Sequence, residues 1–246
     1  MRNRTAIITG ATSGMGEATA RKLAALGMNL IITGRNETKL TALASELNNN
    51  IKVAPKSGDI SSPEFIKELL EFSYNSINPQ PSIYILSAGM GLPGSILSSD
   101  PDKWREMIEL NYISVLQQLR QCAEWFIKNP THEIHDIIVI GSTAGRNPSA
   151  LNSVYASTKT ALIGLVDSLR QELCQHNIRV SLIEPGFTAS GFQKAASYNQ
   201  ATLDKLQNEL GEMLQPEDIA NTIAFMVNQP ANIHVDNIRI RPLRQK

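Results

Sequence analysis

Seven short apolar runs, each about the length of a β-strand, alternate along this chain with longer segments of helical periodicity. The apolar runs span residues 5–9, 29–33, 51–54, 82–86, 136–140, 178–183 and 235–240. The helical segments span residues 14–26, 37–48, 62–75, 102–128 (one helix or two), 153–175 and 216–228. Buried strands that alternate with helices form a parallel sheet with helices on both faces. The pattern therefore predicts an α/β fold of the doubly wound class with a seven-stranded parallel sheet.

The strand order expected for this doubly wound Rossmann fold is 3-2-1-4-5-6-7, and ligands bind at the carboxyl edge of the sheet where the order reverses. Several glycine-containing or polar segments come directly after apolar runs and should therefore meet at that edge. They are Gly10–Gly16, Ala88-Gly89, Ser142 and Pro185-Gly186.

The bulk composition excludes several classes of function. The 246 residues contain no linker, repeat or low-complexity stretch, so we expect residues 1–246 to form a single domain. Lys+Arg and Asp+Glu both number 23, which argues against a broad surface for nucleic acid or anionic lipid. No apolar run approaches the ~20 residues of a membrane span. The basic start, Met1–Arg4, precedes an apolar stretch too short for a signal peptide, so the chain is expected to be cytoplasmic.

The cysteines and histidines give no sign of a disulfide or a metal site. Cys122 and Cys174, the only two cysteines, fall in helical segments and are expected to be reduced, packed thiols. His132 and His135 follow Pro130 in what reads as a surface connection. No further cluster of ligands accompanies them, so no metal is expected.

The first apolar run breaks into three glycines, Gly10, Gly14 and Gly16, before a helical segment begins. A strand, a glycine turn and a helix in this order aim backbone N–H groups and a helix N-terminus at one point, which suits a pyrophosphate. Ordinary turn glycines are the alternative. The context favours a functional role, in which the missing side chains let the backbone approach a pyrophosphate closely.

Tyr155 and Lys159 are four residues apart in a helical segment, so they share one face of the helix. A free tyrosine has a pKa of about 10, and a nearby cation lowers that pKa and makes the phenol a usable acid or base. Ser142 ends an apolar run and precedes Tyr155 by thirteen residues, so a loop can bring its hydroxyl over the start of the helix. Taken alone, the spacing of Tyr155 and Lys159 is explained equally well by a packed tyrosine beside a solvated lysine.

Together with further motifs, these residues make the chain resemble the short-chain dehydrogenase/reductase family over nearly its whole length. The matching residues are Thr9, Gly10, Gly14 and Gly16 in the glycine turn, Asp59, Asn111, Ser142, Tyr155 with Lys159, and Pro185-Gly186. Motifs in this order and at these intervals make a chance coincidence negligible. The resemblance implies an oxidoreductase that transfers a hydride between a nicotinamide cofactor and a small-molecule carbonyl or secondary alcohol substrate.

The resemblance also implies a role for each matching residue. Tyr155 is the general acid or base, and Lys159 lowers its pKa and binds the nicotinamide ribose. Ser142 hydrogen-bonds the substrate oxygen where negative charge develops. Asn111 kinks its helix and holds a water that links Lys159 to solvent, and Asp59 accepts from the adenine amino group. The expected cofactor contacts are Gly10, Thr12, Ser13, Gly14, Met15, Gly16, Arg35, Asp59, Ile60, Ala88, Gly89, Tyr155, Lys159, Pro185, Gly186 and Thr188.

The end of the second apolar run bears on the choice between NAD and NADP. A carboxylate at this point binds the ribose 2′-OH of NAD and repels a 2′-phosphate. Gly34 occupies the position at which NAD-type members of the family carry Asp, and Arg35 follows it. A guanidinium beside the adenosine ribose suits a phosphate. A solvent-facing Arg35 is the weaker alternative because the carboxylate is also absent, so we expect NADP(H).

The chain departs from the family pattern in places. Ser87 stands where the family has Asn, and the family's Thr near Pro185-Gly186 is matched only by Ser190. The last segment, residues 235–242, is more similar to that of NADP-dependent serine and 3-hydroxy acid dehydrogenases than to the common pattern of the family. An NADP-dependent ketoreductase is the leading hypothesis. A hydroxy acid or serine-type dehydrogenase of the same family, an idle NADP-binding sensor and a sugar-nucleotide epimerase or dehydratase are the alternatives.

The resemblance further implies a homodimer or homotetramer, with the segments 102–128 and 153–175 as the main interface. Four side chains in the first of these segments are more apolar than a solvated helix surface requires, although a role in the monomer core would also explain them. They are Leu116, Leu119, Trp125 and Phe126.

We expect a substrate with an apolar body, held under a loop or lid at about 187–215. The expected pocket residues are Met90, Leu92, Leu151, Phe187, Phe192, Tyr198 and Met213. Several of these side chains could instead only pack the lid against the sheet. Arg146, close after Ser142, offers the competing possibility of a site for a substrate carboxylate.

Overall fold

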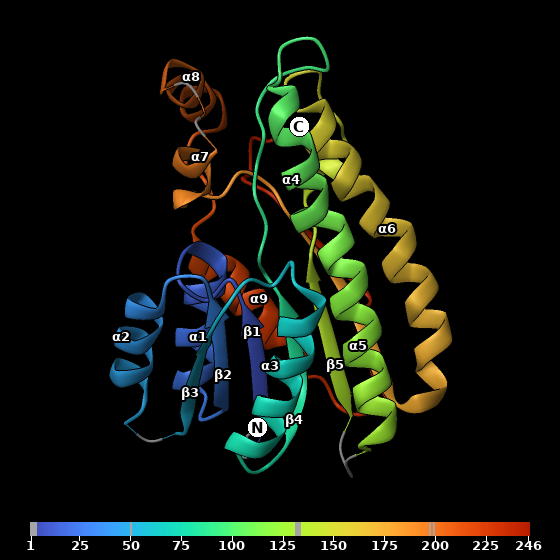
Figure 1. Cartoon of the computed structure of the whole chain (residues 1–246). Coiled ribbons are helices and arrows are strands. Elements are labelled where there is room, and N and C mark those ends of the chain that lie inside the picture. Colours follow the sequence, from blue (N-terminus) through green and yellow to red (C-terminus); the bar gives the residue numbers. More distant parts are fainter. Residues whose placement is uncertain (1–3, 50, 131–133, 197, 199) are drawn as a thin grey trace.

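The computed structural model describes residues 4–49, 51–130, 134–196, 198 and 200–246. Its strands form one parallel sheet in the order β3-β2-β1-β4-β5-β6-β7, which confirms the predicted fold class and strand order (Figure 1). The strands are β1 (Thr5–Thr9), β2 (Asn29–Gly34), β3 (Val53–Ser57), β4 (Pro81–Leu86), β5 (His135–Ile140), β6 (Ile178–Pro185) and β7 (Asn237–Ile240). The expectations for Met1–Asn3 and for His132 lie outside the described residues.

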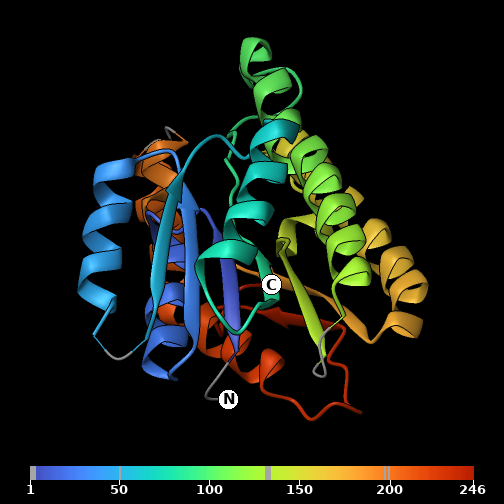
Figure 2. The same cartoon turned by 60° about the horizontal axis from the view of Figure 1, so that its bottom comes forward.

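Helices connect the strands and cover the sheet, with α2 and α6 on opposite flanks of the molecule in two views (Figures 1 and 2). They are α1 (Gly14–Ala25), α2 (Glu37–Leu47), α3 (Pro63–Ser76), α4 (Trp104–Ile108), α5 (Ser114–Lys128), α6 (Ser153–Leu173), α7 (Gly191–Ala195), α8 (Gln200–Leu210) and α9 (Pro216–Val227). Local signals set several of their ends. Ser62 Oγ accepts from Phe65 N at the start of α3, and Gln215 forms a capping box with Asp218 at the start of α9.

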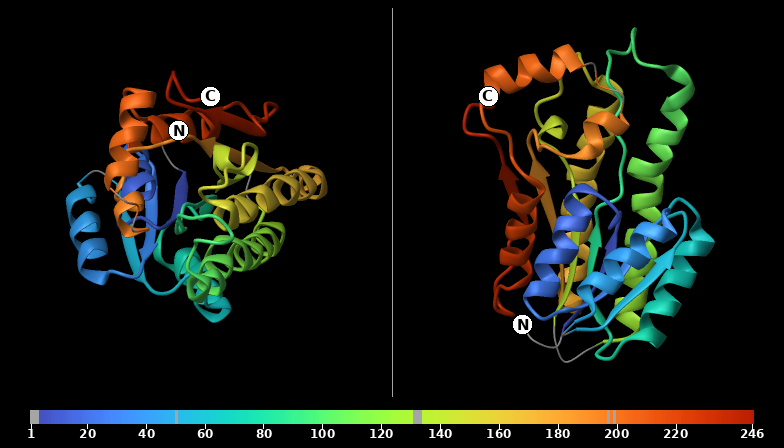
Figure 3. Two further views of the ribbon diagram at one scale, coloured as in Figure 1. Left: turned by 90° about the horizontal axis from the view of Figure 1, so that it is seen from above. Right: turned by 90° about the vertical axis from the view of Figure 1, so that its left-hand side faces the viewer.

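The apolar core consists of two layers, one on each face of the sheet. Successive residues of a strand point to opposite faces, so Ile7 joins the layer beneath α3, α5 and α6, while Ile8 joins the layer beneath α1, α2 and α9. Tyr84 and Ile85 on β4 divide in the same way. Figure 3 shows the two sets of helices on either side of the sheet. This two-sided burial explains why the strands read as continuous apolar runs rather than as alternating ones.

The structure corrects the bounds of the third predicted strand and decides between the two expectations for the segment 102–128. The third strand lies at Val53–Ser57 rather than 51–54, because it is an edge strand whose residues are only partly buried and therefore carry a weak apolar signal. The helical stretch 102–128 divides into α4 and α5 around a π-helical turn, Glu109–Ile113, that contains Asn111. A π-helical turn inside a helix is frequent at functional sites.

A buried ion cluster holds the strands together at the end of the sheet opposite the glycine turn. The Asp136 carboxylate accepts from Arg179 Nε at 2.7 Å and Nη2 at 3.0 Å, and from Arg4 Nη2 at 2.8 Å. Arg179 Nη1 also donates to the backbone oxygen of Ile233 at 2.7 Å, which ties in the segment before β7. Asp136 and Arg179 are almost fully buried. Nothing in the sequence pattern had singled out this cluster.

The histidine and cysteine expectations hold only in part. His135 is wrong as a surface residue, because it begins β5, is buried and packs its ring 4.2 Å from that of Phe126. Burial lowers the pKa of His135 to about 4. Cys122 and Cys174 are both free thiols, but only Cys122 is packed, since Cys174 is exposed in a turn after α6. Within the described residues no group of three or more His, Cys, Asp or Glu side chains could hold a metal ion.

None of the helices in the described part of the chain is both long enough and apolar enough to cross a membrane.

Candidate active site

A cavity of about 620 Å³ lies at the carboxyl edge of the sheet, where the segments after β1, β4, β5 and β6 meet. Ser142, Tyr155 and Lys159 line it together with Met15 and Gly186. Helices α7 and α8 stand above this edge, across from α4 (Figures 1 and 3). The structure thus brings Ser142, Tyr155 and Lys159 to one cavity with Met15 of the glycine turn, although the turn lies far from them in the sequence.

The glycine turn after β1 leaves no room for a side chain at Gly10 or Gly16. A Cβ on Gly16 would lie 2.3 Å from the backbone oxygen of Gly10, and one on Gly10, which has φ of +67°, would lie 3.0 Å from Ala88. Thr9 Oγ1 accepts from the backbone N–H groups of Ser87 and Ala88 at 3.1 and 3.3 Å. The turn therefore packs against the loop after β4, and Ser87 is held there through its backbone rather than through the side chain. With α1 beginning at Gly14, this cradle fits a dinucleotide pyrophosphate.

Lys159 and Asn111 are fixed beneath the cavity by hydrogen bonds to backbone. Lys159 Nζ donates to the Ile140 oxygen at 3.0 Å, and burial lowers the pKa of Lys159 to about 8. Asn111 uses both ends of its amide on Met90, since Nδ2 donates to the Met90 oxygen at 2.7 Å and Oδ1 accepts from the Met90 N–H at 2.9 Å. Gly89 passes between the two, because a Cβ there would lie 3.2 Å from Asn111 Oδ1 and 3.8 Å from Lys159 Nζ.

Tyr155 stands in the first turn of α6 and points its ring into the cavity. Burial raises the pKa of Tyr155 to about 12, a hydrogen bond with Ser142 lowers it, and Tyr198 raises it further. This direction is opposite to the lowered pKa expected from Lys159. Lys159 Nζ lies 5.9 Å from the centre of the Tyr155 ring and donates to Ile140, so loss of solvent outweighs the ammonium.

Ser142 begins a single turn, Thr143–Gly145, and its Oγ accepts from the Ala144 N–H at 3.1 Å. The turn packs tightly on α6, because a Cβ on Gly145 would lie 2.7 Å from the Lys159 oxygen. Thr160 Oγ1 donates to the Gly145 oxygen at 2.8 Å. These contacts fix Ser142 relative to the helix that carries Tyr155.

The residues expected at the adenosine end lie side by side after two paired strands. Gly34 ends β2 opposite Ser57 on β3, and Gly58 N donates to the Gly34 oxygen at 3.1 Å. Arg35 and Asp59 are both exposed there. Asp59 Oδ1 accepts from the Ser61 N–H at 2.9 Å. This hydrogen bond caps the loop after β3 and does not involve Oδ2 of Asp59.

Gly34 has a second role in addition to lacking a carboxylate. A Cβ at Gly34 would lie 3.1 Å from Cγ2 of Thr12, so Thr12 fills the space that a side chain would need. Thr12 belongs to the glycine turn, and this contact joins the turn to the end of β2. Ile60, also expected at this end, is buried.

The Pro185-Gly186 segment is covered by the end of the chain. A Cβ on Gly186 would lie 2.2 Å from Oε1 of Gln245, which accepts from the Phe187 N–H at 3.0 Å. Gln245 Nε2 donates to Thr143 Oγ1 at 3.3 Å, so the C-terminal segment spans two sides of the cavity. Thr188 Oγ1 donates to the Gly186 oxygen at 3.1 Å. Thr188 and Ser190 both line the cavity.

The expectation that Arg146 receives a substrate carboxylate is not supported by its position. Arg146 Nε donates to Glu184 Oε1 and Oε2, both at 3.0 Å, and Glu184 is fully buried. Arg146 is not among the residues that line the cavity. The sequence could not reveal this ion pair because Glu184 lies on β6, far along the chain.

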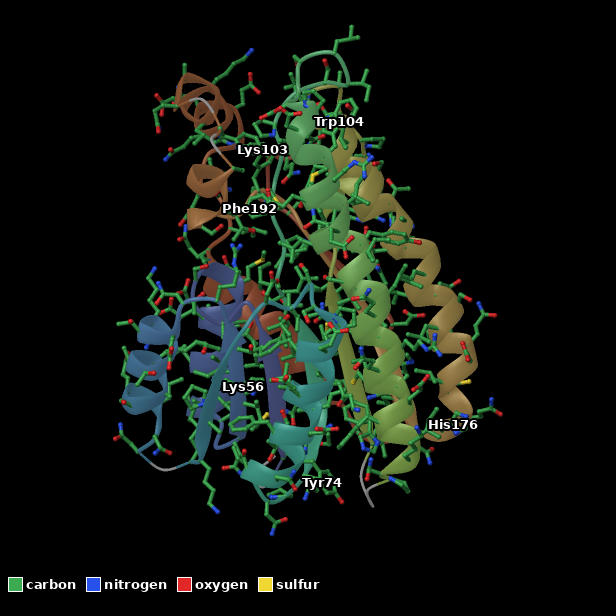
Figure 4. All side chains as sticks on the ribbon, viewed as in Figure 1. Lys56, Tyr74, Lys103, Trp104, His176 and Phe192 are labelled. Atoms are coloured by element: carbon green, nitrogen blue, oxygen red, sulfur yellow. The ribbon has the colours of Figure 1, made fainter. Side chains whose placement is uncertain are left out.

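Part of the expected substrate pocket lines the cavity. Leu151, Phe187, Phe192 and Tyr198 do so, and the Phe192 ring lies 5.9 Å from that of Tyr155 in an edge-to-face arrangement. Phe192 projects from α7 toward the centre of the molecule (Figure 4). The other three expected residues are not among the lining residues. Leu92 and Met90 pack with Met107 beneath the site, and Met213 is half-buried.

Several polar residues that line the cavity were not found from the sequence, and four of them come from two segments. Thr143 and Asn147 come from the turn after Ser142, and Arg241 and Gln245 come from the segment after β7. The first two follow Ser142 closely, and that proximity was the available signal. The other two had none, because their position depends on where β7 places the end of the chain.

Comparisons with known proteins agree with this geometry. A family model for short chain dehydrogenases matches residues 4–201. An uncharacterized oxidoreductase of Staphylococcus epidermidis is 28% identical over 243 residues, which cover 99% of each chain. The structure is similar to the closed form of serine dehydrogenase complexed with NADP+, with a TM-score of 0.87 and 26% identity over 98% of this chain and 96% of that one. It shares its fold with 3-ketoacyl-(acyl-carrier-protein) reductase from Brucella melitensis complexed with NADH, with a TM-score of 0.87 and 22% identity over 99% and 98% of the two chains. The chain therefore belongs to the short-chain dehydrogenase/reductase family of oxidoreductases.

Proposed function

We propose that this chain is an NADP(H)-dependent ketoreductase that interconverts a carbonyl compound and a secondary alcohol. The observation that carries the proposal is one cavity lined at once by Ser142, Tyr155 and Lys159, beside a glycine cradle that only backbone can form. The glycine cradle and membership of the family support a nicotinamide cofactor, which supplies or accepts the hydride when it is bound.

In this proposal each residue handles a proton or a charge. Tyr155 donates a proton to the substrate oxygen in reduction and accepts one in oxidation. Its pKa of about 12 keeps the proton on the phenol at neutral pH, the form that reduction requires. Ser142 donates to the substrate oxygen as negative charge develops there. Lys159 binds the nicotinamide ribose with its ammonium.

Asn111 contributes through backbone in this proposal. Because Met90 occupies both polar ends of the Asn111 side chain, that side chain serves to hold the loop after β4. The π-helical turn Glu109–Ile113 widens the backbone at Asn111. We assign to that backbone the water that links Lys159 to solvent.

The test of the proposed function is a screen for NADPH oxidation across ketone classes, with identification of the product alcohol. Aliphatic, alicyclic and aryl ketones and oxo acids form the panel. Loss of NADPH together with formation of the matching alcohol supports the proposal. Binding of NADPH without turnover of any ketone would instead favour an idle NADP-binding sensor.

NADPH is expected to be preferred over NADH by at least about tenfold in catalytic efficiency, equivalent to about 1.4 kcal/mol. Arg35 offers a cation at the adenosine end, and Gly34 carries no carboxylate to repel a 2′-phosphate. Steady-state kinetics of wild type and Arg35→Ala with both cofactors measure the preference. Arg35→Ala should lower the catalytic efficiency with NADPH and leave that with NADH nearly unchanged. Equal efficiencies with the two cofactors in the wild type would contradict the assignment.

The catalytic efficiency for NADPH, measured at saturating ketone, is expected to fall above about pH 8. Burial lowers the pKa of Lys159 to about 8, so the ammonium that binds the ribose is present below this pH and lost above it. The kcat/KM for NADPH in the free enzyme should fall tenfold per pH unit on the alkaline side. Circular dichroism at each pH shows that the protein remains folded. A level profile up to pH 9.5 would show that Lys159 keeps its proton.

A hydroxy acid or serine-type dehydrogenase is the second candidate. It is supported by the 26% identity to serine dehydrogenase over nearly the whole of both chains. The same ketone panel separates the two, because it contains oxo acids beside neutral ketones.

We further propose that residues 1–246 act as one domain, with 187–215 as the lid, and that the enzyme is a homodimer or homotetramer. Leu119 and Phe126 do not support the expected interface, because both are buried in the core of one chain. Leu116 and Trp125 are only partly buried and remain candidates for that surface.

A further inference from the structure

Arg241 places a guanidinium without an acidic partner at the wall of the cavity. It follows β7 directly and lines the same cavity as Ser142 and Tyr155. Its Nη2 donates to Asn147 Oδ1 at 3.0 Å. Its Nε is buried and has no hydrogen-bond partner among the described residues.

The neighbouring arginines differ from Arg241 in this respect. Arg146 Nε lies 3.0 Å from Glu184 Oε2, and Arg239 Nε lies 3.8 Å from the same atom. In the part of the chain that the structure describes, Arg241 forms no ion pair, and its one hydrogen-bonded partner is the neutral amide of Asn147. A partly buried cation without a counter-charge is costly, and an anion bound beside it offsets that cost.

The charges of the side chains that line the cavity also favour an anionic ligand. Among the described residues that line it, the cationic side chains are Lys159, Arg241 and Lys246, and no aspartate or glutamate is present. Lys159 is assigned to the nicotinamide ribose. Arg241 is therefore available to a substrate, and a guanidinium matches the planar geometry of a carboxylate with two parallel hydrogen bonds.

We infer that Arg241 binds the carboxylate of the substrate, so that the substrate is an oxo acid or its hydroxy acid. This inference rests on the proposed function, since the carbonyl of the same molecule would react at Tyr155. Leu151, Phe187 and Phe192 line the cavity as well and accommodate an apolar body between the two polar ends. Because no acidic side chain lines the cavity, an amino acid such as serine would bring an ammonium group without a partner.

The test compares oxo acids with their neutral esters in wild type and Arg241→Gln. Acetoacetate and 5-oxohexanoate, each paired with its methyl ester, are assayed with NADPH, and L-serine is assayed with NADP+ against 3-hydroxybutyrate. Arg241→Gln should lower kcat/KM for the acids by about 10- to 100-fold and leave the esters within about twofold. The kcat/KM of Arg241→Lys for the acids should lie between those of wild type and Arg241→Gln. The control is Arg120→Gln, because Arg120 is exposed on α5 and pairs only with Glu124 in the described structure.

The outcomes separate this inference from the proposed function. Suppose that wild type reduces the esters. If Arg241→Gln then leaves kcat/KM for the acids unchanged, or lowers kcat/KM for acids and esters equally, the carboxylate site is wrong and the ketoreductase stands. A preference for L-serine over 3-hydroxybutyrate that Arg241→Gln leaves unchanged would also overturn it. If wild type reduces ketones of the earlier panel but neither oxo acid, the inference is wrong and the ketoreductase stands. If wild type reduces no ketone at all, the proposed function fails, and calorimetric titration of 5-oxohexanoate into the NADPH complex decides the inference. Binding that is lost in Arg241→Gln supports the site, and equal binding overturns it.

Discussion

Replacing Tyr155 by phenylalanine is expected to lower kcat by about 100- to 10,000-fold, the usual contribution of a positioned acid or base. The substitution removes the phenolic proton and almost no volume. Tyr155 sits against Phe192 and in the first turn of α6, and phenylalanine keeps those contacts. NADPH affinity should therefore stay within about twofold of wild type, since the glycine cradle and Lys159 are unchanged.

Single-turnover kinetics and fluorescence titration with NADPH measure the two quantities separately. Tyr198→Phe is the matched control, because Tyr198 lines the same cavity and loses the same hydroxyl. We expect it to retain most of the activity. If Tyr155→Phe kept more than a few per cent of wild-type kcat, a different group would have to be the acid.

Replacing Asp136 by asparagine is expected to lower the free energy of unfolding by about 3–5 kcal/mol, the typical cost of breaking a buried ion pair from one side. Asparagine has nearly the same shape but cannot neutralise the two guanidiniums of Arg4 and Arg179. Arg179 would remain buried beside an uncharged partner. Because typical domains are stable by about 5–15 kcal/mol, such a loss threatens folding itself.

Urea denaturation followed by circular dichroism measures this change. Glu46→Gln is the control, because Glu46 pairs with Arg21 on the exposed surface of α2, and exposed ion pairs contribute little to stability. Asp136→Glu tests the geometry, since it keeps the charge but lengthens the side chain. A change below about 1 kcal/mol in Asp136→Asn would mean that the cluster does not hold the sheet together.

The fold class and strand order could be predicted from the sequence because they depend on local pattern. Strands buried on both faces, such as β1 and β5, must be apolar at nearly every position, and this makes them visible without any tertiary information. The predicted position of β3 was wrong by a few residues, because an edge strand is only half buried and its apolar pattern is weak. The sequence left open whether 102–128 is one helix or two, because a π-helical turn such as Glu109–Ile113 is too short to change the periodicity.

The positions of the proposed catalytic residues and of the glycines were also accessible from the sequence, since their spacing encodes those positions. Tyr155 and Lys159 share a helix face because helical geometry requires it, and Gly10 and Gly16 follow a strand whose end reaches the ligand edge. Their electrostatics were not accessible. The pKa of Tyr155 is raised because its ring is enclosed on several sides by parts of the chain remote in sequence.

The pairing of the charged groups could not be predicted from the sequence and became visible in the folded chain. Arg146 and Arg241 look alike in the sequence, yet Arg146 pairs with Glu184 from β6, while Arg241 lines the cavity and, among the described residues, donates only to the neutral amide of Asn147. The strands, the glycine turn and the helix that carries Tyr155 could be predicted from the sequence alone, because each follows from spacing within a short segment. The pairing of buried charges depends on distances between residues that lie far apart along the chain, and those distances exist only once the sheet has assembled.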